Sequence, residues 1–353
     1  MSNRKYINTW YNWGRIINLN EEANYGRKNR KRIKMGCSGN RYNCKWNGTG
    51  PWKNGKKLYA VANRTHRKAV EFAKKYGVQK VYDKIEDMFT DKETDIIYIT
   101  TPHNTHIKFM IEALKNGKHV LCEKSITLNS EELEEAVKIA KEKDFILGEA
   151  MTIFNMPLYT ELLEIVNSGK LGDVKMIQVN FGSYKEYDMN NRFFNRNLAG
   201  GALLDIGVYA ISITRLFMTS KPDNVLSQVK YAPTGVDEQV GIIMMNKEQQ
   251  MSTIALTLHS KQPKRVVIAC EKAYIEITEY PRADKAKIVY TETGEVEEIT
   301  AGITANALQY ELRNMEESVK TGINKMKLEY TIDVMDIMTK LRKEWGMTYP
   351  EEE

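Results

Sequence analysis

The stretch Asp95–Lys124, DIIYITTPHNTHIKFMIEALKNGKHVLCEK, decides the fold of this chain. Its first residues, Asp95–Thr100, form an apolar run that stops before a proline, which is typical of a buried strand. Apolar side chains then recur at helical spacing up to Gly117, and a second apolar run follows at His119–Cys122. A strand, a helix and another apolar strand in this order predict two parallel strands joined by a crossover helix.

The same alternation continues on both sides of this unit. Further strands and helices are predicted at Leu58–Asn63, His66–Tyr76, Ser130–Lys143 and Phe145–Gly148. Continuous apolar strands separated by amphipathic helices favour a doubly wound parallel sheet that is covered by helices on both faces. The sequence therefore predicts an α/β nucleotide-binding domain of the Rossmann type over residues 58–148.

The pattern changes after Glu149, because strands now follow one another without helices between them. Strands are predicted at Val174–Phe181, Asn224–Tyr231, Val236–Met245, Ser252–His259 and Arg265–Ile277. Helices are predicted at Tyr159–Ser168, Gly200–Met218, Gln309–Lys320 and Ile332–Trp345. This order predicts an α+β domain over residues 149–353, with an open, mostly antiparallel sheet.

The first 57 residues have a composition of their own. They hold 14 Lys and Arg but only two acidic residues, whereas the rest of the chain holds 38 basic and 44 acidic residues. Four of the five Trp also lie in this segment, which predicts an aberrant, irregular stretch over residues 1–57. No apolar run is long enough for a membrane span or a signal peptide, so we expect a cytoplasmic protein without a membrane partner.

Three ordered motifs carry a resemblance to a known family. They are Thr100–His106 (TTPHNTH), Gly117–Lys124 (GKHVLCEK) and Gly200–Tyr209 (GGALLDIGVY). Together they resemble the glucose–fructose oxidoreductase and inositol dehydrogenase (Gfo/Idh/MocA) family, and the third motif resembles its dihydrodiol dehydrogenase-like branch. The resemblance covers Leu58–Trp345. It implies an NAD(P)-dependent dehydrogenase that transfers hydride between NADP and a secondary carbinol of a sugar, polyol or dihydrodiol.

Three residues are the catalytic candidates. Lys124 follows a strand end, where ligands bind in open α/β sheets, and its ammonium can stabilise negative charge on a reacting oxygen. Asp205 and Tyr209 lie four positions apart in a predicted helix and so share one face. The resemblance implies that Tyr209 exchanges the substrate proton, that Lys124 lowers its pKa, and that Asp205 orients a hydroxyl or Lys124. Ser125 stands where the family usually has Pro, which predicts a looser turn after Lys124.

The cofactor candidates begin after the second predicted strand, at Asn63 and Arg64. An Arg at this position can pair with a 2′-phosphate, so NADP is favoured, and NAD stays possible. The resemblance adds further cofactor-binding residues, namely Thr101, Pro102, His106, Glu123 and Lys124. For His106, a place on the helix surface is the alternative. No metal is expected, because His103 and His106 have no carboxylate at zinc-ligand spacing.

The expected phosphate loop is missing from the sequence as written. A dinucleotide fold begins with a strand and G-x-G-x-x-G, but Met35–Lys57 offers neither a strand nor an amphipathic helix. Codons for this segment, read one base later, allow GTGIIANGMA from position 39. We therefore interpret the N-terminus as frameshifted, with the first strand and the phosphate loop lost. This interpretation predicts weak or no NADP binding and an inactive chain.

Two other functions stay open at the sequence level. One is a non-catalytic, cofactor-binding sensor or regulator on the same fold. The other is nucleic-acid binding through the basic N-terminus, but this segment lacks a recognisable module and reflects the wrong frame, so no nucleic-acid partner is expected. The expected partners are a small-molecule substrate and a second copy of the chain, which pairs through the open sheet.

Overall fold

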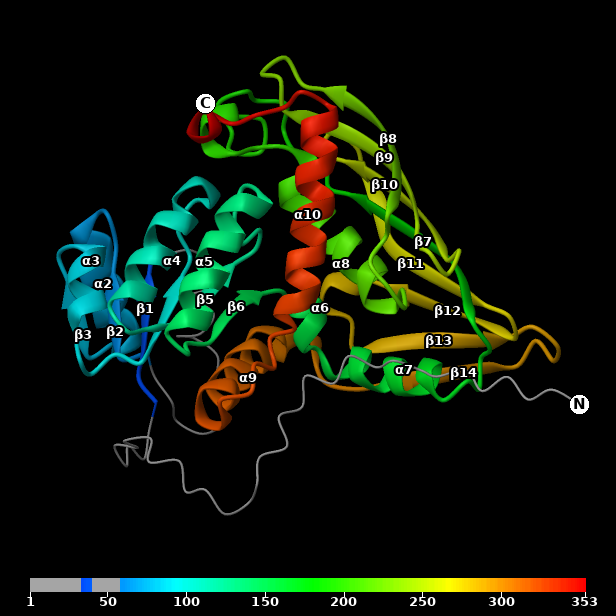
Figure 1. The fold of residues 1–353 in the computed structure, drawn as a ribbon, viewed down its shortest axis with the longest axis horizontal. Helices are drawn as coiled ribbons and strands as arrows, with labels where there is room; N and C mark the ends of the chain where they lie inside the picture. Colours follow the sequence, from blue (N-terminus) through cyan, green and yellow to red (C-terminus); the bar gives the residue numbers. More distant parts are fainter. Residues whose placement is uncertain (1–32, 40–57) are drawn as a thin grey trace, which may run out of the picture. The chain divides into compact units, whose positions relative to one another are not determined.

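The computed structural model describes residues 33–39 and 58–353, which form two sheets (Figure 1). The first is a parallel sheet of six strands in the order β3-β2-β1-β4-β5-β6. Its strands are β1 (Met35–Ser38), β2 (Ala60–Ala62), β3 (Lys80–Tyr82), β4 (Ile96–Ile99), β5 (His119–Glu123) and β6 (Leu147–Ala150). The predicted doubly wound fold is confirmed.

One part of that prediction is wrong, because the first strand is present. Residues Met35–Ser38 form β1, which pairs in parallel with both β2 and β4 at the centre of the sheet. All four residues are buried. Met-Gly-Cys-Ser has no β-branched residue that would mark it as a strand. It forms one because β2 and β4 pair with it on either side, and a sequence pattern does not reveal such pairing. The expected phosphate loop begins at Gly39, and its remaining positions fall on residues 40–57, outside the described residues.

The helices of this domain follow the predicted periodicity. They are α2 (His66–Tyr76), α3 (Ile85–Thr90), α4 (His106–Lys115) and α5 (Ser130–Glu142). The Asn129 side chain caps α5 by accepting a hydrogen bond of 2.8 Å from the Glu132 N–H. The sequence pattern did not reveal β3 and α3, because elements of three and six residues are too short to show a period.

The second sheet has eight strands in the order β14-β13-β12-β11-β7-β10-β9-β8. They are β7 (Val174–Gly182), β8 (Asn224–Tyr231), β9 (Asp237–Met245), β10 (Met251–Thr257), β11 (Gln262–Cys270), β12 (Ala273–Thr278), β13 (Lys285–Tyr290) and β14 (Val296–Thr300). Only β7 and β10 pair in parallel within this sheet, so the mostly antiparallel prediction is confirmed. The predicted single strand Arg265–Ile277 is in fact a hairpin of β11 and β12.

The remaining helices are α6 (Thr152–Asn155), α7 (Pro157–Asn167), α8 (Val208–Phe217), α9 (Ala307–Thr321) and α10 (Leu328–Glu344). Helix α9 packs on β6, and α10 runs between α5 of the first domain and α8 of the second (Figure 1). The C-terminal helices thus join the two sheets. Within the described part of the chain, one segment, Arg196–Phe217, is long and apolar enough to cross a membrane, but 78% of that segment's apolar window is buried inside the structure.

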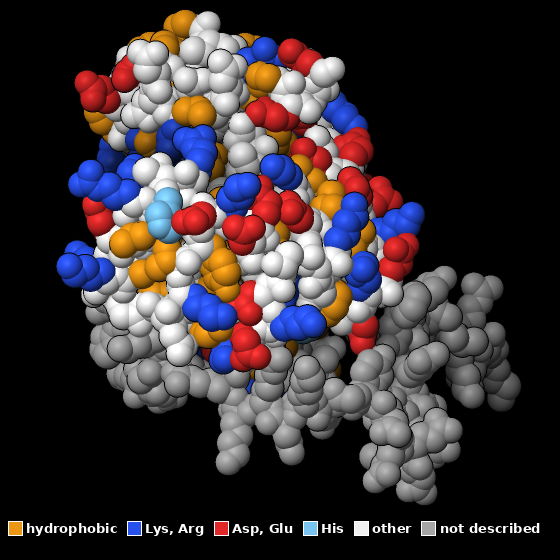
Figure 2. All heavy atoms as spheres, turned by 90° about the vertical axis from the view of Figure 1, so that its left-hand side faces the viewer, with side chains coloured by type: hydrophobic (Ala, Val, Ile, Leu, Met, Phe, Trp, Pro, Cys, Tyr) orange, Lys and Arg blue, Asp and Glu red, His pale blue; other side chains and the backbone are white. Residues whose placement is uncertain are grey.

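Two surfaces bear on the expected partners. On the open face of the second sheet, Leu226 and Ile243 lie opposite each other and are 63% and 47% exposed. Pairing of two copies through this face stays a prediction. Figure 2 shows the side of the first domain, where Lys and Arg side chains alternate with Asp and Glu over the described atoms.

Candidate functional site

The carboxyl end of β5 brings Lys124 to the second domain. Its ammonium donates to the backbone carbonyl of Asp205 over 2.5 Å and lies 3.4 Å from the Asp205 Oδ1. Both side chains are only 14% exposed. Burial alone would lower the pKa of Lys124, but Asp205 and Tyr209 outweigh burial and raise it. Lys124 is therefore a positioned cation at neutral pH.

A π-helical turn over Leu203–Gly207 presents Asp205 to this lysine. The N–H of Val208 bonds to the Leu203 carbonyl, five positions earlier, before the chain continues as α8. Turns of this kind occur mostly as single insertions in α-helices, and frequently at functional sites. The predicted helix over Gly200–Met218 is therefore not uniform. The Asp205 carbonyl accepts a hydrogen bond from the Lys124 ammonium. The spacing of side chains in the sequence could not predict this backbone contact.

The structure brings Tyr209 to the same place. The Lys124 ammonium lies 4.8 Å from the centroid of the Tyr209 ring, which also packs on Phe181. Burial raises the pKa of Tyr209, and this effect exceeds the opposing effect of Lys124. Lys124 does lower the pKa of Tyr209, as expected, but desolvation of the phenolate dominates, so the net pKa lies above its ordinary value.

Arg192 is a site residue that the sequence did not single out. Its guanidinium lies 3.5 Å from the Asp205 Oδ1. Burial would raise the pKa of Asp205, but Lys124 and Arg192 outweigh burial and hold it below its ordinary value. Arg192 stands in the irregular stretch between β7 and the π-helical turn, where no periodic signal identifies it. Its position in a long connecting loop of a ligand-binding domain was the available signal.

Ser125 and two histidines hold the turn that follows Lys124. The buried Ser125 hydroxyl donates to the Leu204 carbonyl over 2.9 Å, so the predicted looser turn is wrong. The ring nitrogens of His106 lie 3.0 Å from the carbonyls of Thr101 and Ser125. His103 Nε2 lies 3.1 Å from the Lys124 carbonyl. The side chain of Ser125 thus ties the turn to the second domain, as a proline could not.

The N-terminal end of the Asp205 segment rests on Asp237, at the start of β9. The Asp237 Oδ2 accepts a hydrogen bond of 2.6 Å from the Leu203 N–H. Gly201 lies directly against this carboxylate, since a Cβ at Gly201 would be 2.1 Å from Oδ1. Gly201 also has a φ of +122°, which few other residues adopt. Gly201 of the third motif is thus explained by its close approach to a buried carboxylate, whereas Gly200 lies against the backbone of Arg192 and Phe193.

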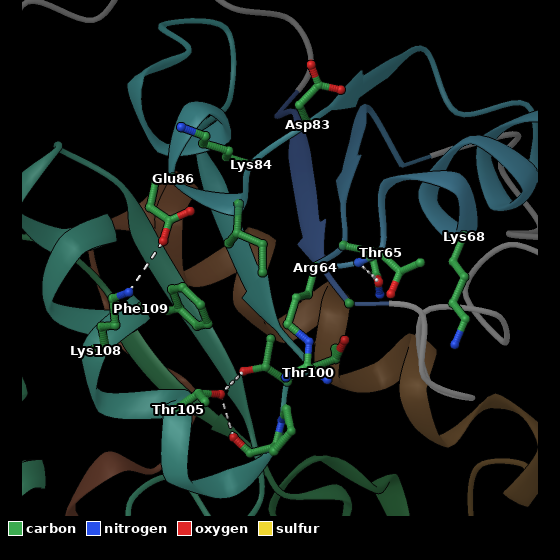
Figure 3. Close-up of a pocket in the computed structure, with 15 residues that line it drawn as sticks. Arg64, Thr65, Lys68, Asp83, Lys84, Glu86, Thr100, Thr105, Lys108 and Phe109 are labelled. Carbon is green, nitrogen blue, oxygen red and sulfur yellow. Dashed lines mark hydrogen bonds and ion pairs between the residues drawn. The ribbon is translucent and has the colours of Figure 1, made fainter.

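A pocket of about 490 Å³ lies at the carboxyl ends of β1, β2 and β4 (Figure 3). Four of the predicted cofactor residues line it, namely Asn63, Arg64, Thr101 and Pro102. The other three do not line it. His106 is fully buried, Glu123 accepts a hydrogen bond from the buried Tyr98 hydroxyl, and Lys124 lies at the Asp205 contact.

The charges of this pocket suit a phosphate group. Its acidic residues are engaged, since Asp83 pairs with His66 over 2.9 Å and Glu86 pairs with Lys108 over 3.5 Å. Arg64 reaches into the pocket (Figure 3), and its guanidinium contacts no carboxylate in the described part of the chain. Lys68, which the sequence analysis missed, lines the same pocket from α2.

The end of β1 suits the close approach that a dinucleotide requires. Gly39 has a φ of +118°, and a Cβ there would lie 2.5 Å from the Thr100 hydroxyl. Its N–H donates to the Ala62 carbonyl over 2.8 Å. A glycine that turns the chain at the end of the first strand is what the first position of a phosphate loop needs. Among the described residues, no group of three or more His, Cys, Asp or Glu is arranged to hold a metal ion.

Comparisons with known proteins agree with this geometry. Residues 35–151 match the family model described as an oxidoreductase family with an NAD-binding Rossmann fold, and residues 159–276 match the GFO/IDH/MocA C-terminal domain. The chain is 28% identical over 305 residues to a trans-1,2-dihydrobenzene-1,2-diol dehydrogenase of Xenopus laevis, covering 83% of this chain and 91% of the relative. The enzyme of the same name from Mus musculus is 26% identical, with 84% and 90% covered.

Solved structures share the fold. An aldose-aldose oxidoreductase from Caulobacter crescentus, complexed with glycerol, superposes with a TM-score of 0.78 at 18% identity and covers 89% of this chain and 98% of its own. A 3-ketoreductase from Actinomadura kijaniata, complexed with NADP and TDP-benzene, gives a TM-score of 0.77 at 17% identity, with 88% and 97% covered.

Proposed function

The chain belongs to the GFO/IDH/MocA oxidoreductase family, and on that premise we propose that it transfers hydride between NADP and a secondary carbinol of a sugar, polyol or dihydrodiol. One observation carries this proposal: the Lys124 ammonium contacts Asp205 and the Tyr209 ring at the carboxyl end of β5. Ligands of open α/β sheets bind at these strand ends. A cation and a phenol placed there suit a reaction that moves a hydride and a proton together.

Each of the three side chains has a role in the proposed reaction. The bound nicotinamide supplies the hydride donor or acceptor. In carbonyl reduction, the Tyr209 hydroxyl gives its proton to the substrate oxygen while Lys124 stabilises the negative charge that develops there. In alcohol oxidation, the Tyr209 phenolate takes the hydroxyl proton back. Asp205 orients Lys124, because it holds the ammonium through both its carbonyl and its carboxylate.

The cofactor proposal rests on the first domain. Arg64 and Lys68 line a pocket whose acidic groups are already paired, so both cations are available to a 2′-phosphate. NADP is also the cofactor of the A. kijaniata ketoreductase structure, and NAD stays possible. Asn63, Thr101 and Pro102 would line the same part of the dinucleotide.

Turnover tests the catalytic proposal. The full chain would be assayed with NADPH against a panel of ketoses and oxidised polyols, and with NADP⁺ against sugars, polyols and dihydrodiols. We expect activity that falls at least about a hundredfold in Lys124→Met and in Tyr209→Phe, because each removes a group that acts in the transition state. Activity that survives both substitutions would contradict the proposal. NADPH binding without turnover on any substrate would favour the sensor alternative, which the intact trio Lys124, Asp205 and Tyr209 does not support.

The frameshift interpretation needs its own test. The expected inactivity of the chain is not supported, because Lys124, Asp205 and Tyr209 come together in the structure. Because the expected phosphate loop lies outside the described residues, weak NADP binding stays a prediction. The chain as written and a variant that carries the shifted reading before Lys57 would be titrated with NADPH by fluorescence. We expect tighter binding by the variant, and equal affinity would overturn the interpretation. A gene without an inserted or deleted base near codon 57 would also refute the frameshift.

A further inference from the structure

Lys185 is a half-buried lysine beside the proposed active site. It follows β7, and its backbone is fixed, since its N–H donates to the Leu258 carbonyl over 2.8 Å and its carbonyl accepts from His259. The ammonium lies 4.3 Å from the centroid of the Phe193 ring. In the described part of the chain it forms no ion pair with a carboxylate. A partly desolvated ammonium without an acidic partner is costly for the folded protein.

Other cations surround this ammonium. The Arg192 guanidinium lies 4.1 Å from the centroid of the same Phe193 ring, so the two cations share one aromatic partner. Burial lowers the pKa of Lys185, and Arg192, Lys124 and Lys264 lower it further, while Asp205 acts in the opposite direction. The fold therefore places several positive charges close together. Their mutual repulsion disfavours the folded state unless an anion binds there.

The carboxylates near this cluster are already engaged. The Asp205 carboxylate lies within 3.5 Å of both Lys124 and Arg192, so it already forms ion pairs with two cations other than Lys185. Lys264 pairs with Glu279 over 2.7 Å. In the described part of the chain, Lys185 has no carboxylate partner, and Arg192 shares Asp205 with Lys124. Part of the positive charge of Lys185 and Arg192 is therefore not neutralised by these carboxylates. Asp205 interacts electrostatically with both residues, which places that charge next to the proposed reacting groups.

We propose that Lys185 and Arg192 form an anion subsite that binds a carboxylate or phosphate group of the substrate. The inference rests on the proposed function, because it assigns the substrate of that reaction to the anionic sugars and polyols. Arg can bind either group through two parallel hydrogen bonds, and Lys adds a point charge. The anion would lie on the Phe193 side of Asp205, and the reacting carbinol would lie toward Lys124 and Tyr209.

Binding, measured without turnover, tests the subsite. The full chain would be titrated calorimetrically at low salt with D-gluconate, D-glucose 6-phosphate and neutral D-glucose. We expect at least one anionic probe to bind about tenfold more tightly than glucose, and the carboxylate and phosphate probes distinguish the two groups. Lys185→Met should remove that advantage and leave glucose binding unchanged. The matched control is Lys170→Met, because Lys170 pairs with Glu297 elsewhere in the domain and should keep the advantage.

A second measurement guards against a variant that fails to fold. Because Lys185 lies among like charges, Lys185→Met should raise the midpoint of thermal unfolding without ligand, whereas Lys170→Met should not. Equal binding of all three probes, or an anion advantage that survives Lys185→Met, would overturn the subsite. If the Lys185-dependent binding is found but no probe is oxidised with NADP⁺ and no carbonyl substrate of the panel is reduced with NADPH, the subsite stands and the proposed reaction fails.

Discussion

The Ser125 hydroxyl donates to the Leu204 carbonyl over 2.9 Å, and the adjacent Lys124 ammonium holds the next carbonyl along, that of Asp205. Two consecutive residues of the first domain thus donate hydrogen bonds to two consecutive carbonyls of a π-helical turn in the second domain. Lys124, which we propose to be catalytic, is therefore placed by backbone contacts as well as by its ion pair. These bonds join the two domains at the candidate site.

We expect Ser125→Ala to lower the free energy of unfolding by about 1 kcal/mol, because the buried Leu204 carbonyl loses its donor. The turnover number should fall about tenfold as Lys124 loses its fixed position. Urea unfolding and steady-state kinetics measure the two effects. The control is Ser168→Ala, whose exposed hydroxyl bonds only locally, to the Ile165 carbonyl and the Lys170 N–H. Equal effects of the two substitutions would contradict a positioning role for Ser125.

Gly201→Ala should be strongly destabilising. Its Cβ would meet the Asp237 carboxylate at 2.1 Å, and the φ of +122° is strained for alanine. We expect a loss of about 2–4 kcal/mol of unfolding free energy, measured by urea denaturation. Gly241→Ala is the matched control, since a Cβ there meets nothing within 4 Å and should change stability little. A small effect at Gly201 would show that the close approach to Asp237 is wrong.

The burial of Asp237 predicts a dependence of stability on pH. Burial raises the pKa of Asp237 from 3.8 to about 7. A carboxyl whose pKa is raised in the folded state binds its proton more tightly there, so its stabilising contribution is full at acid pH. That contribution is lost as the pH rises from about 4 to about 7. Asp237→Asn should flatten this part of the profile by about 2–4 kcal/mol. Glu149, whose pKa is also raised to about 7, should leave a remaining slope.

The raised pKa of Tyr209 predicts opposite pH dependences for the two reaction directions. At neutral pH the phenol keeps its proton, so it is ready to protonate a carbonyl oxygen in reduction. Alcohol oxidation needs the phenolate and should accelerate as the pH rises through the alkaline range. Initial rates in both directions from pH 6 to pH 10 measure this. An oxidation rate that is flat over this range would exclude Tyr209 as the proton acceptor.

Arg64→Ala should weaken the binding of NADPH about tenfold and leave the binding of NADH nearly unchanged, because only NADPH carries the 2′-phosphate. Fluorescence titration of the two cofactors measures the difference. Arg67→Ala is the control, since Arg67 pairs with Glu71 on the exposed side of α2 and does not line the pocket. An equal loss for NADH and NADPH would assign Arg64 to another part of the dinucleotide.

The parts of the fold that the sequence predicted well have a strong local signal. Helix α2 was predicted with its observed bounds, His66–Tyr76, because its apolar period and the following Gly77 are both visible in the chain. Strand β8 was likewise predicted at Asn224–Tyr231. The weak predictions lack such a signal, as in β1, where four small or unbranched residues are held by strands on either side.

The amino-acid sequence by itself predicted the order of two domains and the periodic helices, since these follow from local patterns. The roles of Lys124, Asp205 and Tyr209 were implied by the family resemblance and stay proposals. Tertiary structure alone decided that Met35–Ser38 is the central strand, and that Lys124 binds the carbonyl of a π-helical turn. It also gathered Lys185 and Arg192 beside Asp205. The reason is physical: backbone hydrogen bonds and burial join residues far apart in the chain, and the balance of burial and neighbouring charges sets the net direction of each pKa shift.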